Sequence, residues 1–505
     1  MKNIIILGFM LCSICGFSQG KMDYNWLIGV EQDPSPDYPI NCMNLLSFKA
    51  GELDIERLSV SYPLYGTNTS ISGNNGNLLF YSNGCDIKDR QHNIMPNGDG
   101  LNPGILHENN CPDGGYSAIG GIIILPTPND TSKFYVFHQA FEVFNESPFI
   151  RINRLYYSKV DMTLNNALGD VTIKNQPILT SQIQVGIQAV KHGNSQDWWV
   201  MAISLYGNKY YKILLTEDGV TEIDSQSIGG VLSFNGGGQI AFSPDGTKFA
   251  KYDFMDQLML FDFDRNTGLL SNYQQMEIDS HLLNFSGLAF SPNSKRLYLS
   301  TQTKLWQLDL EAPDISASKT LVGEYDGFVY EFFNLLFPVY FQRMQLGPDC
   351  KIYMTSHGPV AYMHVINDPD ELGTACNFEQ RGLPLPCSVN YSIPNFPHYR
   401  LGTGYPVCDS NIVYVSSGYV PPPVQAVRVW PNPASGRVTV SLLVPLPQTV
   451  AWHLHDQLGR EVRLALLPAG QQEVEVQLAG VPPGLYFWQM EQEGQRVGSG
   501  KLIMH

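Results

Sequence analysis

Charge is scarce in this sequence. Charged residues make up 15% of its 505 residues, and acidic residues outnumber basic ones by 47 to 31, for a formal net charge of −16. An average soluble domain carries about 25% charged residues. An acidic surface repels phosphate backbones, and no basic stripe interrupts the acidity, so we exclude nucleic acid as a partner.

Long hydrophobic runs are also missing. The apolar run at the N-terminus, Ile4–Cys15, has twelve residues, whereas a bilayer-spanning helix needs about 20. It follows Lys2 and is followed by the small residues Gly16, Ser18 and Gly20. This pattern is typical of a secretory signal peptide. Neither Cys12 nor Cys15 follows the small residue that a lipoprotein signal requires. We interpret residues 1–20 as a cleavable signal peptide and expect no membrane anchor.

Cysteine is sparse and its spacing is irregular. Two of the nine cysteines lie in the signal peptide, and seven belong to the mature chain. These seven include no Cys-x-x-Cys pair, and no two histidines have the spacing of a zinc motif, so we predict no zinc site. Export permits disulfides, and an odd count leaves at least one thiol unpaired. Cys376 and Cys387 flank a short loop rich in Gly and Pro, and we predict that they pair.

Catalytic signatures are absent. The sequence contains no Gly-x-Ser-x-Gly and no His-Glu-x-x-His, and we predict no catalytic residue, cofactor or metal ligand. Asp262–Gly268 resembles a calcium loop, but its glycine falls one position late and no glutamate closes it, which favours a hairpin turn. Asp245 and Asp349 are likewise interpreted as turn residues.

Some residues remain candidates for a site. His192, His357 and His364 fall near predicted strand ends that could face a central channel, although a structural role is favoured for each. The aromatic pairs Trp198–Trp199 and Phe332–Phe333 could stack against sugars, but such pairs more often lie in a core.

What the sequence does contain is a repeat. Between residues 22 and 405, a short apolar strand ends in a polar turn and a second apolar strand follows at once. Three clear copies and three looser ones share this pattern: 240–249, 288–298 and 344–353, then 73–81, 128–135 and 192–199. Their second strands recur every 48 to 64 residues. A period near 50 with several strands in each unit is typical of β-propeller blades.

The six units do not account for the whole region. Residues 26–30 and 44–48 add two strands before the first unit, and residues 393–401 add material after the last. Joining both ends of the chain in one further blade gives seven blades, with six or eight left open. We therefore predict an all-β fold with a propeller over residues 22–405.

This region resembles a family of exported propeller-like proteins common in the Bacteroidetes. The resemblance rests on Gly76–Gly84 (GNLLFYSNG), His92–Gly98 (HNIMPNG), Val160–Met162, Ala189–His192 and the Ser-Pro-Asp-Gly turn at 243–246. It implies a fold and says little about activity.

The composition changes after a proline-rich linker at residues 406–424. Residues 425–505 contain one Asn, no Cys and nine Gln, and their acidic and basic residues balance at six each. About seven strand-like segments fit here, several of them alternating apolar and polar residues, as in Val474–Leu478. The pattern predicts a small immunoglobulin-like β-sandwich.

This segment closely resembles the type A sorting domain of the type IX secretion system. The motif residues that carry the likeness run through the whole segment in order: Pro431, Asn432, Pro433, Gly436, Asp456, Gly459, Gly484, Tyr486 and Lys501. Trp430 replaces the usual Tyr or Phe. The resemblance implies recognition by the outer-membrane translocon and its sorting protease, removal of the domain, and release or surface attachment of the rest. The alternative is an adhesion module of similar fold.

These features together predict a protein that is secreted or displayed at the cell surface after Sec export through the periplasm. We expect its propeller to act as a binding or scaffold module for a glycan or a protein. Two alternatives stay open: a secreted propeller enzyme, a hydrolase or lyase with its active site at the central channel, and a structural component of a surface layer.

Overall fold

The computed structural model describes most of the mature chain. It covers residues 20–29, 42–60, 62–64, 66–112, 114–145, 150–232, 238–253, 257–279, 286–332, 335–414, 427–442, 449–492 and 495–505. Residues 1–19 of the predicted signal peptide (1–20) and most of the predicted linker (415–424) lie outside these ranges. Within them, no helix is long and apolar enough to cross a membrane.

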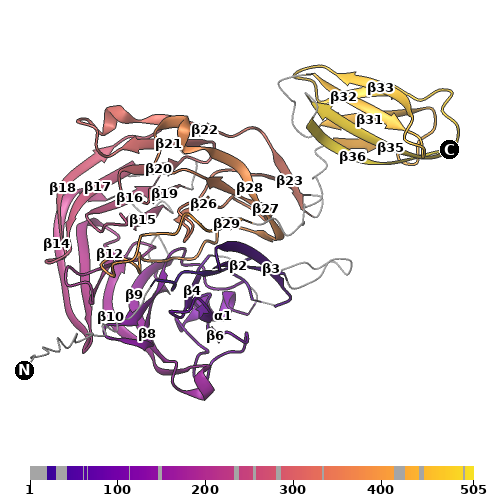
Figure 1. The fold of residues 1–505 in the computed structure, drawn as a ribbon. Coiled ribbons are helices and arrows are strands. Elements are labelled where there is room, and N and C mark those ends of the chain that lie inside the picture. Colours follow the sequence, from indigo (N-terminus) through magenta and orange to yellow (C-terminus); the bar gives the residue numbers. More distant parts are fainter. Residues whose placement is uncertain are drawn as a thin grey trace, which may run out of the picture.

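Seven antiparallel sheets follow one another along the chain and form a ring (Figure 1). Their innermost strands are β1 (Asn25–Ile28), β4 (Thr69–Ser72), β7 (Ile122–Thr127), β11 (Gln188–Lys191), β15 (Gln239–Phe242), β19 (Gly287–Phe290) and β25 (Met344–Leu346). The second strands are β2 (Met43–Lys49), β5 (Leu78–Ser82), β8 (Asp130–Val143), β12 (Trp198–Ile203), β16 (Lys248–Asp253), β20 (Arg296–Ser300) and β26 (Ile352–Met354).

The outer strands complete each sheet. The third strands are β3 (Glu52–Leu58), β6 (Ile87–Asp89), β9 (Ile150–Asp161), β13 (Gly207–Thr216), β17 (Gln257–Asp264), β21 (Lys304–Asp309) and β27 (Val360–Ile366). Five sheets continue into β10 (Asp170–Ile183), β14 (Gly219–Leu232), β18 (Leu269–Met276), β22 (Thr320–Glu324) and β28 (Phe378–Val389). A hairpin, β23 (Val329–Phe332) and β24 (Leu335–Pro338), lies between the sixth and seventh sheets, and the short helix α1 (Ile105–Asn110) follows β6. The ring is a seven-bladed β-propeller.

Each of the six repeats predicted from sequence is the turn between the first and second strand of a blade. In the fifth blade, Ser243 N and Lys248 O close the turn at 3.0 Å, and the Asp245 carboxylate accepts the Thr247 N–H at 2.9 Å. Gly246 adopts a φ of +70°, which costs a glycine little. The turn residues therefore act as their sequence predicts, and the propeller prediction is confirmed.

The first blade departs from the regular pattern. Ser72 N bonds Met22 O, Ser70 Oγ bonds Asn25 O and Asn68 Nδ2 bonds Leu27 O. These pairs show that β1 runs antiparallel to β4, its neighbour at the centre of the ring. β29 (Val413–Tyr414) pairs in parallel with β3 at the outer edge of the same sheet. The first blade thus joins the two ends of the propeller.

The propeller extends beyond its predicted boundary at residue 405. Cys408 forms a disulfide with Cys350, and Ile412 is buried in the main core. Together with β29, these contacts place residues 406–414 on the propeller, although they were predicted to belong to the proline-rich linker. A disulfide and a strand pairing attach this segment to the propeller, and its composition indicates neither.

The predicted Cys376–Cys387 disulfide is wrong. Cys387 bonds Cys42, Cys85 bonds Cys111, and Cys376 is the free, buried thiol among the described residues. Cys376 packs with Tyr298 and Leu305 of the sixth blade, whereas Cys387 faces the first blade across the ring closure. Proximity in sequence misled the prediction because the expected loop is the strand β28, which contains Cys387 and separates it from Cys376, so that the two cysteines contact different blades.

The C-terminal domain consists of two sheets over one core. β30 (Val427–Trp430), β31 (Arg437–Leu442) and β34 (Glu473–Gln477) form one sheet. β33 (Glu461–Leu467), β32 (Val450–His455), β35 (Gly484–Gln492) and β36 (Gln495–Met504) form the other. Val440, Trp452 and Leu502 are fully buried between the sheets. This is the small β-sandwich that the alternating pattern predicted.

The Cys42–Cys387 disulfide should contribute more stability than the local Cys85–Cys111 bond. It closes a separation of 345 residues instead of 26 and therefore restricts the unfolded chain more. We expect the Cys42→Ser/Cys387→Ser variant to lose about 2 kcal/mol more unfolding free energy than Cys85→Ser/Cys111→Ser. Denaturant unfolding of both variants measures this difference. Equal losses would show that the bond does not close the ring.

Candidate functional site: the filled centre of the propeller

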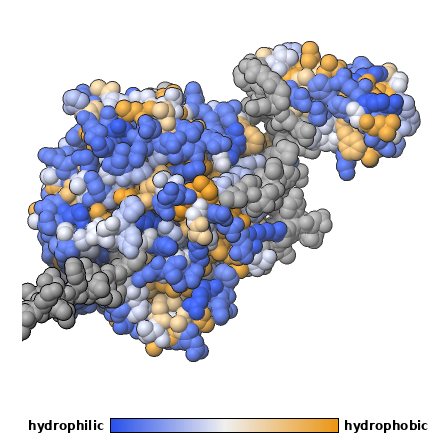
Figure 2. Space-filling model, viewed as in Figure 1, coloured by the Kyte–Doolittle hydropathy of each residue, from blue (hydrophilic) through white to orange (hydrophobic). Residues whose placement is uncertain are grey.

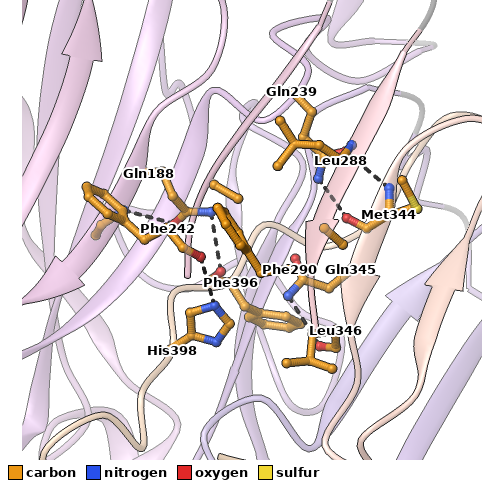
Figure 3. A pocket seen from close by; sticks show the side chains of 13 residues that line it. Gln188, Gln239, Phe242, Leu288, Phe290, Met344, Gln345, Leu346, Phe396 and His398 are labelled. Atoms are coloured by element: carbon orange, nitrogen blue, oxygen red, sulfur yellow. Dashed lines mark hydrogen bonds between the residues drawn. The ribbon is translucent and has the colours of Figure 1, made fainter. Parts of the chain in front are cut away.

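Residues 390–401 follow the last strand of the seventh blade and pass into the centre of the ring. Phe396 and His398 of this segment line a cavity together with residues of β11, β15, β19 and β25. Figure 3 shows their side chains facing the inner strands, with Gln188 and Phe242 close by. We call residues 390–401 the plug. Pro394 and Pro397 interrupt it, and proline cannot donate to a sheet ladder, so the segment adds no strand.

Asn395 anchors the plug to the inner strands. Its Nδ2 lies 3.1 Å from Gly120 O, 3.0 Å from Ile122 O and 3.0 Å from Ile187 O. Its Oδ1 accepts a hydrogen bond from Gln188 Nε2 at 3.1 Å. One amide side chain therefore satisfies backbone groups at the start of two blades, where the inner strands have no further strand to pair with.

Aromatic rings fill the rest of the plug interface. The Phe396 ring centroid lies 5.9 Å from that of Trp26, and the Tyr399 centroid lies 5.9 Å from that of Trp198. The Tyr399 hydroxyl donates to Ile124 O at 2.7 Å. Offset and edge-on aromatic pairs of this kind add to the burial energy of a core.

The far end of the plug is tied to Gly20 and Asp23, the first part of the chain that the structure describes. Arg400 forms a buried, two-pronged ion pair with Asp23, with Nη2–Oδ1 at 2.6 Å and Nη1–Oδ2 at 3.0 Å. Its Nε donates to Gly20 O at 2.8 Å. The plug therefore joins the N-terminal residues to the seventh blade from within the ring.

The plug leaves little open space in the channel. The cavity beside Phe396 and His398 has a volume of about 30 Å³, room for one or two water molecules. His398 is the titratable residue among those that line it. Its Nε2 lies 3.2 Å from Phe242 O, and burial lowers its pKa to about 4. The imidazole is therefore neutral at pH 7, and no carboxylate lines this cavity to act with it in acid–base catalysis.

The histidines singled out from the sequence do not meet in the channel. His192 lies in the turn between β11 and β12, where its ring packs against Trp199 and its Nε2 contacts Asn266 O at 3.0 Å. His364 is fully buried in β27 beside Phe341, and burial lowers its pKa to about 3. His357 packs edge-on against Tyr391. The described structure thus separates the three side chains instead of converging them.

The other sequence candidates have structural surroundings. Trp198 and Trp199 are buried in two different core clusters, and Phe333 lies outside the described residues. Asp264 accepts hydrogen bonds from Asn266 N and Thr267 Oγ1, both at 2.9 Å, as expected for a turn. Asp349 accepts the Tyr353 hydroxyl at 2.6 Å, and burial raises the pKa of this carboxyl to about 6.

One possible metal cluster appears among the described residues, formed by Cys85, His107 and Cys111. The two sulfur atoms form a disulfide, so neither is a thiolate that could bind a cation.

The C-terminal motif residues lie where the two ends of the domain meet, in turns, and at the start of β35. Asn432 joins the start of the domain to its last strand, with Nδ2 2.9 Å from Lys501 O and Oδ1 2.9 Å from Ile503 N.

Other motif residues lie in turns or at the start of a strand. Gly436 and Gly459 adopt φ values of +73° and +78°. At the β32–β33 turn, hydrogen bonds from Arg460 lower the pKa of Asp456. Gly484 begins β35, and the Tyr486 hydroxyl donates to Pro482 O at 2.8 Å. Pro431 and Pro433 flank Asn432.

Fold and tail together define an exported β-propeller protein with a C-terminal sorting domain. Residues 428–505 match the family described as the secretion system C-terminal sorting domain. This domain indicates export by type IX secretion to the cell surface or the extracellular space. No curated protein matches the sequence.

Solved structures show similarity to the propeller at low identity. A functionally unknown protein from Desulfotomaculum acetoxidans DSM 771 is 14% identical, with a TM-score of 0.36, covering 68% of this chain and 92% of its own. The Dos1 propeller is 12% identical, with a TM-score of 0.33, covering 66% and 88%. The gluconolactonase XC5397 from Xanthomonas campestris is 11% identical, with a TM-score of 0.30, covering 65% and 94%. At these scores the matches carry no functional argument.

The sequence did not reveal the plug. The sequence pattern predicts that residues 393–401 join the N-terminal strands in one further blade that closes the ring, and it does not single out Asn395. The signal that was present is the alternation of two prolines with aromatic residues, which disfavours a strand paired on both edges. It does not say where such a segment goes.

Replacing Asn395 with leucine should destabilise the propeller strongly. The substitution preserves bulk but removes the Asn395 donor from the carbonyl oxygens of Gly120, Ile122 and Ile187, of which Gly120 O keeps a bond from Ile187 N at 3.0 Å. We expect a loss of about 2–4 kcal/mol in unfolding free energy. Asn411→Leu, which removes an exposed bond to Asp409, serves as the control and should cost less than about 1 kcal/mol. Similar losses in both variants would mean that the plug does not anchor the ring.

The stability contributed by His398 should depend on pH. Its pKa falls from 6.5 in the unfolded chain to about 4 in the fold, so below pH 6.5 the unfolded chain binds a proton that the folded chain excludes. The stability that His398 provides is complete above 6.5 and is lost as pH falls toward 4. The gap in unfolding free energy between the wild type and His398→Gln should shrink by about 2 kcal/mol from pH 8 to pH 5. A constant gap would contradict burial of the neutral ring.

Proposed function

We propose that the propeller is a binding or scaffold module that acts through its outer surfaces at the cell surface or in the extracellular space. The observation that carries this proposal is the plug. Many ligand sites are preformed concave pockets of about 300–1,000 Å³, whereas the cavity left beside the plug is about 30 Å³. The face visible in Figure 2 is largely hydrophilic, with apolar residues in small scattered groups, and suits contact with a glycan or a protein.

A channel enzyme has less support. Among the residues that line the two central cavities, the titratable side chains are His398 and Arg343, and they belong to different cavities. A hydrolase or lyase needs an acid and a base, or a nucleophile and a base, in one place.

We also propose that the C-terminal motif residues form the surface read by the type IX translocon and its sorting protease. Asn432 and Lys501 come from opposite ends of the domain and meet through a hydrogen bond. Recognition of this paired end would test that the sandwich is folded, because the two segments lie together only when β36 is in place.

The export proposal predicts that Asn432→Ala retains the protein in the periplasm. The variant loses both hydrogen bonds to the last strand. Glu475→Gln, on exposed β34 outside the motif, is the control and should reach the surface normally. Fractionation of the native host with mass spectrometry of terminal peptides measures the outcome. Normal export of Asn432→Ala with its C-terminal domain removed would refute the role of this contact.

Ligand binding is tested with the mature protein on glycan arrays and by cross-linking on intact cells. We expect a glycan or protein partner whose binding is unchanged in His398→Gln, because this side chain lies inside the channel. Loss of binding or of a hydrolytic activity in that variant, with an intact fold, would support the channel enzyme instead.

A further inference from the structure

Arg343 lies in the central channel, immediately before β25. Only 8% of the residue is exposed. It lines a second cavity, at the end of the channel where the inner strands β11, β15 and β25 begin. Ile393, Pro394 and Asn395 of the plug form the opposite wall of this cavity.

The guanidinium group of Arg343 is incompletely satisfied. It carries five N–H donors. Its hydrogen bonds in the described structure run from Nη1 and Nη2 to one acceptor, Gly238 O, at 3.2 and 3.1 Å. No carboxylate of the described residues lies within ion-pair distance. Burial lowers the pKa of Arg343 to about 10, so the group keeps its positive charge at neutral pH.

Arg400 is a second buried arginine of this chain, and its hydrogen-bond partners differ from those of Arg343. It is also 8% exposed, and it meets the Asp23 carboxylate through two bonds and two backbone carbonyls through others. A buried charge without a counter-charge is strongly destabilising, whereas a paired one is tolerated. Arg343 has the same burial as Arg400 but no anionic partner among the described residues.

The surroundings of Arg343 leave room for such a partner. Gly120 approaches Nη2 so closely that a Cβ at this position would lie 3.1 Å from it, and Gly186 also contributes no side chain. The amide side chains of Gln239 and Gln345 complete the polar wall. The cavity volume is about 20 Å³, which suits one particle of about the size of a water molecule or a little larger.

We propose that this cavity binds a small monovalent anion, a halide or a small carboxylate, between Arg343 and the plug. The anion neutralises the guanidinium and occupies donors that the protein leaves open. Because the plug forms one wall, the anion also ties residues 393–395 to the seventh blade. This site is separate from the outer binding surface proposed above.

Diffraction from crystals of the mature protein soaked in sodium bromide locates the anion directly. We expect an anomalous peak within about 3.5 Å of the Arg343 guanidinium nitrogens. Bromide elsewhere but not at Arg343 overturns the proposal. This measurement uses the wild-type protein and does not depend on the folding of any variant.

Thermal unfolding tests the same site in solution. At equal ionic strength, chloride or formate should raise the Tm of the mature protein by about 1–3 °C over gluconate, which is too large to enter. Arg343→Gln should lose this difference. Arg381→Gln, which removes a surface ion pair with Asp326, should keep it.

The comparison of chloride with formate shows which kind of small monovalent anion binds. An effect of chloride but not formate assigns a halide, and an effect of both assigns any small monovalent anion. Equal Tm values in chloride, formate and gluconate, or an unchanged anion effect in Arg343→Gln, would overturn the proposal.

Discussion

The fold depends on the way its centre is filled. Seven sheets in a ring place seven inner strands around an axis, and each inner strand has one edge with no strand to pair with. In this protein the chain itself supplies the missing contacts. The Asn395 Nδ2 lies within hydrogen-bond distance of three carbonyl oxygens of the inner region, and Phe396 and Tyr399 pack against tryptophans of two blades. Removing the plug would expose both polar backbone and aromatic core.

The same segment connects the two ends of the propeller. Arg400 pairs with Asp23 near the start of the mature chain, and the Cys42–Cys387 disulfide joins the first and seventh blades. β29 then adds to the outer edge of the first blade. Closure therefore needs residues from about 20 to 414 to be present at once, and its disulfides need the oxidising conditions met during export. The fold and the export route are consistent with each other.

Because the centre is filled, the channel, the outer surfaces of the ring and the C-terminal domain have different properties. The channel holds a neutral His398 and a charged Arg343 in separate small cavities, which suits structural roles and an anion better than turnover of a substrate. In the function proposed for this protein, a partner is recognised by the outer surfaces of the ring. Recognition by the secretion machinery is left to the C-terminal domain, where Asn432 brings the first and last segments together.

Local patterns in the sequence determined much of this protein. Turns such as Ser243–Gly246 are read correctly because a tight reversal needs particular residues at particular positions, whatever surrounds it. Alternation in Val474–Leu478 predicted a β-sandwich, and the motif residues from Pro431 to Lys501 carried the resemblance to the sorting domain.

Only the tertiary structure decided which distant residues meet. It paired Cys387 with Cys42 and not Cys376, placed residues 406–414 on the ring, dispersed His192, His357 and His364, and directed residues 390–401 into the channel. These outcomes follow from the closing of the ring, whose disulfides join residues 58 to 345 positions apart, and no local pattern records which segments meet.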